Sequence, residues 1–349
     1  MTELYLQKVL KDCVDRRDFL KMMGILGIGL ATPALATPLE SLKFNKNLYK
    51  VSRTRLLMGT FVNIIIMDSS KDKAEDALER TFLEMESLTC ILNRHADNTP
   101  ISQLNRKGIL RDVSPDIYKV MSRADYFYQL SGGAFDITVK PLIDLYEESF
   151  TQTGSPPDVE CVKDILRLID AKNVHYDGEK IEFLKDGMGI TLDGIAKGYI
   201  VDKAAHFLKK AGIEHALINA GGDIKAIGNR GRGKPWRIGI RDPWKKDKNL
   251  EVLSLANEAI ATSGNYEVYF DREKLFHHIL NPKTGYSPRS TTSVTVLAKA
   301  VTDADALSTA TFIFEPKEGK RFVDSISGAE CLIVDGKGMK IRSSGWPVA

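Results

Sequence analysis

The residues with the clearest chemical meaning are Asp305 and Thr309, four positions apart in the run DADALSTA (303–310). If this run begins a helix, residues four apart project from one face, so a carboxylate and a hydroxyl point the same way. Mg²⁺ prefers oxygen ligands and needs few of them from a protein when phosphates also bind it. The spacing therefore predicts a site for a divalent cation and a phosphate-bearing ligand. The nearby Asp303 needs no such role, because an acidic residue at a helix start offsets the helix dipole.

A histidine supplies a second candidate group. His278 precedes the turn NPKTG (281–285), at an element boundary where site residues often lie. Histidine is the usual general base near neutral pH. A single histidine at a strand end is more often only hydrogen-bonded, so the residue by itself leaves both roles open.

Three glycine-containing turns form a further group: GGAFD (132–136), LDGIAKGY (192–199) and NAGGD (219–223). The second leads from an expected short strand, 190–192, into a helix whose free N–H groups and positive dipole end favour phosphate. It is neither a Walker loop nor a GxGxxG motif, so the general signal is weak. Each turn also has an ordinary interpretation, as a helix C-cap, a capped helix or a plain turn.

The elements that must position these groups are a mixture of helices and strands. Apolar residues at helical spacing predict helices over 72–93, from Ser114-Pro115 to Gly132, from about 162, and from the turn 193–198 to 211. A strand pair, or one long strand bent at Gly59, is expected over 56–67, and a strand over 216–219. Irregular chain is expected over 149–160 and 229–250. The mixture predicts an α+β fold with mostly antiparallel sheets.

The N-terminal segment resembles an export signal. Adjacent arginines at 16–17 precede a short apolar run (22–35) and a small-residue cleavage site at Ala34–Ala36. A helix or membrane anchor is the alternative, although the run is short for a membrane span. We expect a twin-arginine-type signal peptide over 1–36, a polar leader over 37–50 and one domain over 51–345. The protein would then be exported to the periplasm or the outer face of the cytoplasmic membrane.

Composition limits the classes of function. Apolar residues make up 43% of the chain and charged residues 27%, as in ordinary globular proteins. The net charge of +3 shows no excess that would indicate nucleic-acid binding. The cysteines that follow the signal are Cys90, Cys161 and Cys331; their wide spacing indicates neither a disulfide framework nor a zinc site, and we expect most of them to be buried.

Taken together, these motifs resemble one family, the FAD:protein FMN transferases of the ApbE family. The resemblance covers roughly Arg53 to Val334 and rests on ordered runs. These are MGTFV (58–62), SGGAFDITVKPL (131–142), DGIAKGYIVD (193–202), NAGGDI (219–224), ATSGNYE (261–267), HHILNPKTG (277–285) and SVTVLAKAVTDADALSTA (293–310). It implies a single T-fold-like catalytic domain with a central flavin-nucleotide cleft.

The resemblance also implies an activity: Mg²⁺-dependent transfer of the FMN half of FAD to a Ser or Thr hydroxyl of a target flavoprotein, with release of AMP. The Mg²⁺ ligands would be the backbone carbonyl of Ala196 with Asp305 and Thr309, and Ser308 lies beside them. His278 matches the residue that deprotonates the acceptor hydroxyl, and Asp305 is expected to be catalytic with it. Flavin contacts are expected from Met58, His95, Ala134, Phe135, Asp136, Asp193, Tyr199 and Leu280. The stretch 90–101 around His95 departs from the family pattern.

The partners follow from the same resemblance. Targets of the family carry an Asp-x-x-Ser/Thr-Gly-Ala-Ser/Thr motif, and an exported enzyme would serve a respiratory or ion-pumping redox complex. The chain itself contains DSISGAE (324–330), whose last residue, Glu330, cannot accept a phosphoester, so we expect no self-flavinylation. Two alternatives remain: an FAD pyrophosphatase that gives FMN and AMP, and a non-catalytic flavin-binding protein.

Overall fold

The structure is a computed structural model that describes residues 39–347, apart from 46, 246–247, 267 and 272–274. The expected signal peptide and Cys13 lie outside the described residues. Within the described ranges, no helix is both long and apolar enough to cross a membrane.

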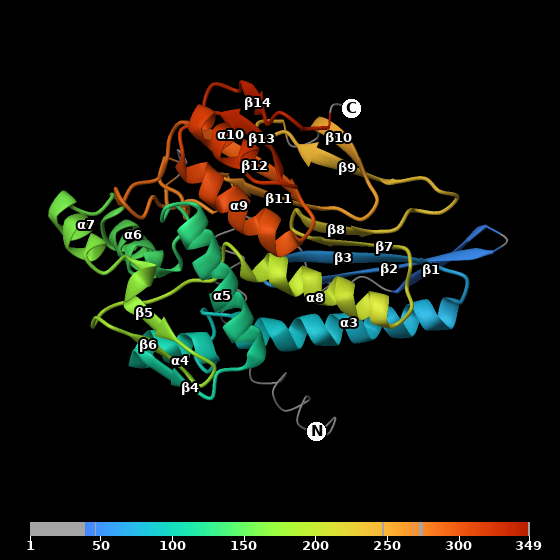
Figure 1. Cartoon of the computed structure of the whole chain (residues 1–349), viewed down its shortest axis with the longest axis horizontal. Helices are drawn as coiled ribbons and strands as arrows, with labels where there is room; N and C mark the ends of the chain where they lie inside the picture. The colour runs from blue at the N-terminus through green and yellow to red at the C-terminus, as the bar shows by residue number, and fades with distance from the viewer. Residues whose placement is uncertain (1–38, 46, 246–247, 267, 272–274, 348–349) are drawn as a thin grey trace.

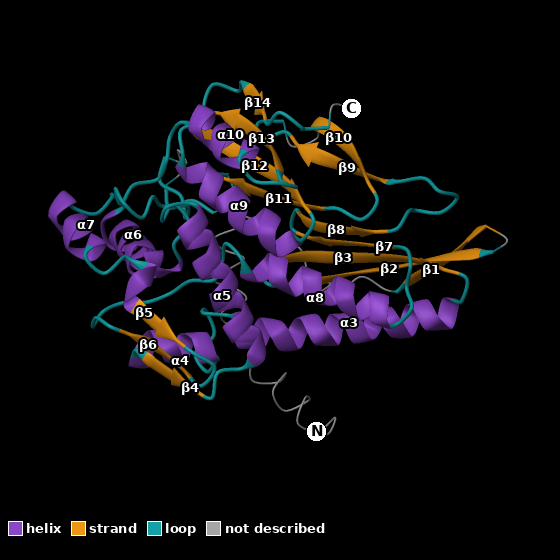
Figure 2. Ribbon diagram, viewed as in Figure 1, coloured by secondary structure: helices purple, strands orange, loops and turns teal. Residues whose placement is uncertain are grey.

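A nine-stranded sheet organises the described part of the chain (Figures 1 and 2). Its order is β1-β2-β3-β7-β8-β11-β12-β13-β14, and every neighbouring pair is antiparallel. The strands are β1 Glu40–Asn45, β2 Leu48–Leu57, β3 Thr60–Asp68, β7 Ala216–Ala220, β8 Asp223–Ile227, β11 Ala259–Gly264, β12 Thr291–Ala298, β13 Glu330–Asp335 and β14 Lys340–Arg342.

Helices cover one face of this sheet. Figures 1 and 2 show α3 and α8 side by side across β2, β3 and β7, with α9 and α10 over the C-terminal strands. Helices α4 to α7 and a small sheet, β4-β6-β5, form the other end of the molecule. The bounds are α3 Lys71–Leu92, α4 Pro100–Lys107, α5 Pro115–Leu130, α6 Lys140–Thr153, α7 Val159–Leu166, α8 Ala196–Lys210, α9 Val301–Ile313 and α10 Pro316–Asp324, with the short helices η1 Ile137–Val139 and η2 Ala171–Asn173, and β4 Ile109–Arg111, β5 Val174–Tyr176 and β6 Lys180–Phe183.

Local sequence explains these elements. The Ser114 side chain accepts a hydrogen bond from the Ile117 N–H and caps α5, whose first residue is Pro115. The apolar stripe of α3 packs against the sheet: Leu78, Phe82 and other buried residues of this helix join Ile64 and Ile66 of β3 in the main core. The expected α+β fold with antiparallel sheets is confirmed.

The opposite face of the sheet carries a two-stranded sheet, β9 (Trp236–Arg241) with β10 (Asn249–Leu255). Trp236, Ile238 and Ile240 are buried against the nine-stranded sheet. We expected irregular chain over 229–250, which is wrong for these strands. The exposed positions of β9 are Arg237, Gly239 and Arg241, and these residues together with the basic turn before the strand gave the segment a polar composition that masked its period of two.

Other expectations are corrected as well. Described residues of the supposed polar leader, 37–50, form β1 and the start of β2. The supposed loop 149–160 is short, because α6 continues to Thr153 and α7 begins at Val159. Residues 190–192 form no strand. The Asn105 side chain accepts a hydrogen bond from the Ile190 N–H at 2.7 Å and donates one to the Ile190 carbonyl at 2.9 Å. These are the backbone groups that a neighbouring strand would otherwise bond.

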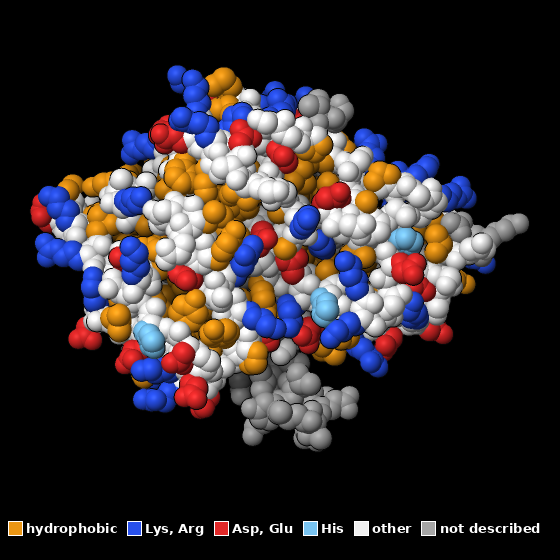
Figure 3. All heavy atoms as spheres, in the orientation of Figure 1, with side chains coloured by type: hydrophobic (Ala, Val, Ile, Leu, Met, Phe, Trp, Pro, Cys, Tyr) orange, Lys and Arg blue, Asp and Glu red, His pale blue; other side chains and the backbone are white. Residues whose placement is uncertain are grey.

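Charged side chains of both signs are mixed on one face of the molecule, and the described cysteines differ in exposure. On the face that α3 and α8 form, Figure 3 shows Lys and Arg interspersed with Asp and Glu, without a patch of one sign. Of the described cysteines Cys331 is buried and Cys90 half-buried, whereas Cys161 is exposed on α7 and so departs from the expected packing role.

Candidate active site

The centre of the candidate site is a cluster of oxygen atoms between α9 and β11. Asp305 is 4% exposed and Ser308 is fully buried. The Ser263 hydroxyl of β11 lies 2.7 Å from the Ser308 hydroxyl and 3.3 Å from that of Thr309. The Ser308 hydroxyl also donates a 2.9 Å hydrogen bond to the main-chain carbonyl of Asp305. The structure therefore brings the predicted Asp305, Ser308 and Thr309 together and adds a hydroxyl from a second element.

The start of α8 meets this cluster. The Gly198 N–H donates a 3.1 Å hydrogen bond to Asp305 Oδ2. A Cβ atom at Gly198 would lie 2.5 Å from the Val301 carbonyl oxygen, so only glycine permits this approach of α8 to α9. Ala196 is the first residue of α8, which places its backbone beside the cluster.

A carboxylate from α8 also fixes the start of α9. Asp202 accepts hydrogen bonds from the backbone N–H groups of Val301 and Thr302, at 3.0 Å and 2.8 Å. Ala300, the N-cap residue of α9, has no side chain that could accept these hydrogen bonds. Asp202, which belongs to α8, therefore caps α9 in its place. The two helices that carry the predicted metal ligands are thus held in one register.

Further charges lie around Asp305. Asp223, 1% exposed at the start of β8, pairs with Lys197 of α8 at 2.8 Å. Burial and the charge of Asp223 raise the pKa of the Asp305 carboxyl well above its usual range, against the pull of Lys197. A buried carboxylate in this position is stabilised by any cation that binds it.

The donor atoms fit Mg²⁺ by their chemistry. The described residues contain no group of three or more His, Cys, Asp or Glu that could hold a metal, and this set has instead one carboxylate with hydroxyl oxygens. Such hard oxygen ligands, few in number, suit a Mg²⁺ ion that also binds phosphates and water. The role of the Ala196 carbonyl stays a prediction.

His278 lies between β11 and β12, in a connection (265–290) whose described residues are irregular. Its Nδ1 atom lies 2.9 Å from the Val268 carbonyl oxygen. A carbonyl only accepts, so Nδ1 carries the hydrogen and Nε2 keeps a lone pair. Nε2 makes no hydrogen bond to a residue in the described part of the chain. Burial lowers the pKa of His278, which keeps the ring neutral, and the charges of Asp193 and Lys197 act on that pKa, which places the ring near both.

Asp193 anchors the turn before α8. The Arg94 Nε atom lies 2.9 Å from its carboxylate, and the His95 Nε2 atom 3.8 Å from it. Burial works against the charge, but Arg94 and His95 together hold the pKa of Asp193 well below its usual range. The predicted His95 and Asp193 therefore lie side by side, and a permanent negative charge stands near His278.

The GGAFD turn reaches the same place. A Cβ atom at Gly194 would lie 3.1 Å from Thr309 Oγ1 and 3.3 Å from Phe135 Cε2, so the Phe135 ring and the Thr309 hydroxyl flank this glycine. Phe135 and its neighbour Ala134 are buried. Phe135 thus lies at the predicted site.

Met58 occupies the hairpin turn between β2 and β3. Its φ of 54°, with 70° at Gly59, matches the tight hairpin turns that place both central residues in the left-handed region. In the adjacent NAGGD turn, a Cβ at Gly221 would lie 2.3 Å from Thr60 Oγ1. The Met58 turn therefore packs beside the turn that leads into Asp223.

Three predicted flavin contacts have side chains engaged elsewhere. The Asp136 carboxylate accepts hydrogen bonds from Thr138 and from the Ala171 N–H, and burial raises its pKa to about 6. The Tyr199 hydroxyl donates to Asp116 of α5 at 2.6 Å. Leu280 is buried in a separate apolar cluster with α6 and α7. Flavin contact by these residues stays a prediction.

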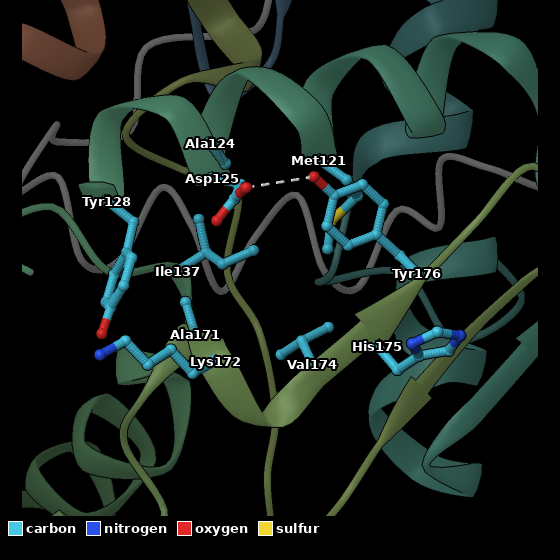
Figure 4. Close-up of a pocket in the computed structure, with 10 residues that line it drawn as sticks. All are labelled: Met121, Ala124, Asp125, Tyr128, Ile137, Ala171, Lys172, Val174, His175 and Tyr176. Atoms are coloured by element: carbon cyan, nitrogen blue, oxygen red, sulfur yellow. Dashed lines mark hydrogen bonds between the residues drawn. The ribbon is translucent and has the colours of Figure 1, made fainter. Parts of the chain in front are cut away.

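A pocket of about 300 Å³ lies outside this cluster (Figure 4). It opens between α5, η1, η2 and β5; Asp125, Tyr128, Lys172, His175 and Tyr176 contribute its polar groups. Among the residues that the structure describes, those that line it include none of the predicted site residues. This pocket is therefore no part of the candidate active site.

Sequence reasoning missed three polar residues of the site: Arg94, Asp223 and Ser263. Asp223 and Ser263 belong to the runs NAGGDI and ATSGNYE. A polar residue beside a glycine in a run of this kind is the signal that could have predicted them. Arg94 had no signal, since a single arginine at a helix end is usually solvated.

Comparison with known proteins agrees with this geometry. The family model ApbE matches residues 58–333. An FAD:protein FMN transferase of Treponema pallidum is 29% identical over 305 residues (81% of this chain, 84% of the relative), and one of Haemophilus influenzae 26% over 315 residues (86% and 91%). The crystal structure of the ApbE protein of Thermotoga maritima is 32% identical, with a TM-score of 0.76 over 85% of this chain and 97% of that one. The resemblance drawn from the motifs is confirmed, and the chain belongs to the ApbE family.

Proposed function

We propose that this protein is an FAD:protein FMN transferase that links FMN to a Ser or Thr hydroxyl of a target flavoprotein. The phosphoanhydride bond of FAD breaks, a phosphoester forms between the acceptor oxygen and the FMN phosphorus, and AMP leaves. Relatives that span most of this chain carry the transferase name, and the supporting observation in this structure is the oxygen cluster of Asp305, Ser308, Thr309 and Ser263 beside the start of α8.

The chain's own residues have distinct tasks in this reaction. His278 has a neutral ring, and its Nε2 lone pair accepts no hydrogen bond from the residues that the structure describes, so it can take the proton of the acceptor hydroxyl. Asp193, kept ionised beside Arg94, stabilises the imidazolium that results. The first turn of α8 presents backbone N–H groups toward phosphate oxygens. Ala196, Asp305, Ser308 and Thr309 would hold Mg²⁺, which neutralises phosphate charge when it is bound.

The direct test supplies FAD, Mg²⁺ and a peptide that contains the Asp-x-x-Ser/Thr-Gly-Ala-Ser/Thr motif. Mass spectrometry should show one added FMN on the peptide and an equal amount of AMP. A matched peptide with alanine at the final position should gain no mass. Release of AMP without a labelled peptide would instead indicate a pyrophosphatase, and bound FAD without AMP would indicate a flavin carrier.

We also propose export by the twin-arginine route and a target in a membrane redox complex. The support is the sequence of residues 1–36. Replacement of Arg16 and Arg17 by Lys should leave the protein in the cytoplasmic fraction, whereas the unaltered chain should reach the periplasmic fraction. Equal distribution of both proteins would contradict this proposal.

A further inference from the structure

A second pocket lies at the far end of the sheet from the active site. Its volume is about 510 Å³, and it opens between the β1–β2 hairpin, β3, β7 and the turn 229–234 before β9. Strand β2 runs from Leu48 at this end to Leu57, next to the Met58 turn. Lys50, which lines the pocket, lies seven residues before Leu57 on this strand, so about 23 Å of strand separate it from the Met58 turn, and the pocket has no part in the chemistry described above.

The pocket has an unbalanced positive charge. Its lining includes Lys50, Arg230, Arg232, Lys234 and Arg237, and no Asp or Glu from the described ranges. None of the five cations forms an ion pair with a residue in those ranges. Over the central helices in Figure 3, by contrast, Lys and Arg are interspersed with Asp and Glu. A concave site with charges of one sign attracts anions.

Three of the cations, Arg230, Arg232 and Lys234, belong to one closed turn whose backbone is fixed. The Arg230 N–H donates to the Lys234 carbonyl at 2.9 Å. Arg232 has a φ of 55°, an uncommon value for a residue with a side chain. A Cβ atom at Gly231 would lie 3.4 Å from Phe44 and 3.5 Å from Leu48, so the turn packs on the β1–β2 hairpin. The charged groups therefore form one wall of a defined pocket.

Apolar side chains form the rest of the pocket. Phe44, Met67 and Trp236 line it. Phe44 is 51% exposed, and Leu42, on the same strand, is 61% exposed. Leu42 pairs with Lys50 across β1 and β2, so their side chains project from the same face. An inorganic anion would use the cations alone, whereas an anionic head group with a hydrocarbon tail uses both kinds of side chain.

We infer that this pocket binds the phosphate head group and the first tail carbons of an anionic phospholipid, which places the β1–β2 end of the sheet against an anionic bilayer surface. Basic residues around exposed apolar side chains are the usual means by which a protein lies on such a surface. The inference does not depend on the proposed transferase activity.

The test uses the full chain and two probes. The first is dihexanoylphosphatidylglycerol below its critical micelle concentration, followed by tryptophan fluorescence because Trp236 lines the pocket, with inorganic phosphate as the free-anion comparison. The second is flotation with vesicles of phosphatidylcholine alone or of phosphatidylcholine and phosphatidylglycerol at 3:1. Binding should require phosphatidylglycerol and should weaken as salt rises.

The key variant is Arg230→Gln/Arg232→Gln/Lys234→Gln, in the exposed turn. Its matched control is Lys107→Gln/Lys317→Gln/Lys337→Gln, which removes the same charge from exposed positions elsewhere. The key variant should lose affinity for phosphatidylglycerol by roughly tenfold or more, and the control should bind as the unaltered chain does. Both keep residues 1–38, so any contribution of that segment cancels.

A second pair of changes separates lipid from free phosphate. Leu42→Ser/Phe44→Ser should weaken binding to the short-chain lipid and leave the salt dependence unchanged. The inference is overturned if the key variant and its control bind alike, if inorganic phosphate binds as tightly as the lipid, or if the Leu42/Phe44 variant binds normally. Should the triple variant not fold, Arg230→Gln alone serves. AMP release in lipid-free solution should be unchanged in these variants, so the two proposals fail separately.

Discussion

Replacement of Asp305 by Asn tests the charge of this side chain with little change in its shape. Asp305 is almost fully buried, and the Asn side-chain oxygen can still accept the hydrogen bond from Gly198. Loss of one preorganised electrostatic partner in a buried site typically lowers turnover by about 10²–10³-fold. We expect a loss of this size in an assay that measures AMP and labelled peptide at saturating FAD and Mg²⁺.

The same replacement, although it lowers turnover, should raise the free energy of unfolding. Burial and Asp223 raise the pKa of Asp305 in the folded state, so the folded protein binds this proton more tightly than the unfolded chain does. Between the unfolded pKa, near 4, and the raised folded value, the free energy of unfolding should fall by up to about 1.4 kcal/mol per pH unit. Asn has no such dependence, so in EDTA at pH 7.5 the variant should melt at a higher temperature than the unaltered protein.

Asp303→Asn is the matched control on the same helix. Asp303 pairs with Arg123 of α5 at 2.7 Å and lies outside the oxygen cluster. Its replacement should leave turnover intact. Unchanged turnover in the Asp305 variant, an equal loss in the Asp303 variant, or a lower melting temperature of the Asp305 variant in EDTA would refute the reasoning.

Four further predictions concern other parts of the chain. His278→Gln should lower the rate of FMN transfer by about 10²–10⁴-fold and leave the Kd for FAD nearly unchanged, as measured by single-turnover kinetics and fluorescence titration. Gly198→Ala should lower the free energy of unfolding by about 1–3 kcal/mol, because its Cβ would clash with the α9 backbone; Gly178→Ala, with no atom within 4 Å, should not. Burial lowers the pKa of His277 to about 4, below its unfolded value near 6.5, so stability should fall by up to roughly 3 kcal/mol as pH drops from 6.5 to 4, and denaturant titration of His277→Gln should lack this fall. The purified protein with FAD and Mg²⁺ should show no added FMN by mass spectrometry, because Glu330 replaces the acceptor residue; covalent flavin on the chain would contradict this.

Much of the fold was predictable where one local signal dominated. Ser114-Pro115 marks the start of α5, and the apolar stripe over 72–93 marks α3 within a residue or two. Strands whose outward residues are charged were harder, as β9 shows. Residues 190–192 misled for another reason: Asn105, 85 positions away in sequence, forms hydrogen bonds with both backbone groups of Ile190, so no neighbouring strand pairs with them there.

In the candidate site, too, residues that are close in sequence could be predicted and long-range contacts could not. Asp305 and Thr309 follow from helical spacing, since residues four apart share one face of α9, whereas Ser308 was expected only from the family resemblance. The contacts that complete the site join residues with large separations in sequence. Ser263 reaches α9 across 45 positions, and Asp202 caps the same helix from about 100 positions away. The spacing of residue types along the chain cannot predict such contacts, because the two residues come together only when the whole sheet has folded.

The position of His278 has a consequence for the choice of protein acceptor. Asp305, Ser308 and Thr309 lie on α9, which Gly198 and Asp202 hold against α8, whereas His278 lies on the connection between β11 and β12, whose described residues form neither helix nor long strand. Its loop can change in length and composition between relatives without disturbing the phosphate end of the site. Recognition of different acceptor proteins can therefore diversify through residues 265–290 alone, and a chimaera that exchanges only this segment should exchange acceptor preference while AMP release from FAD continues.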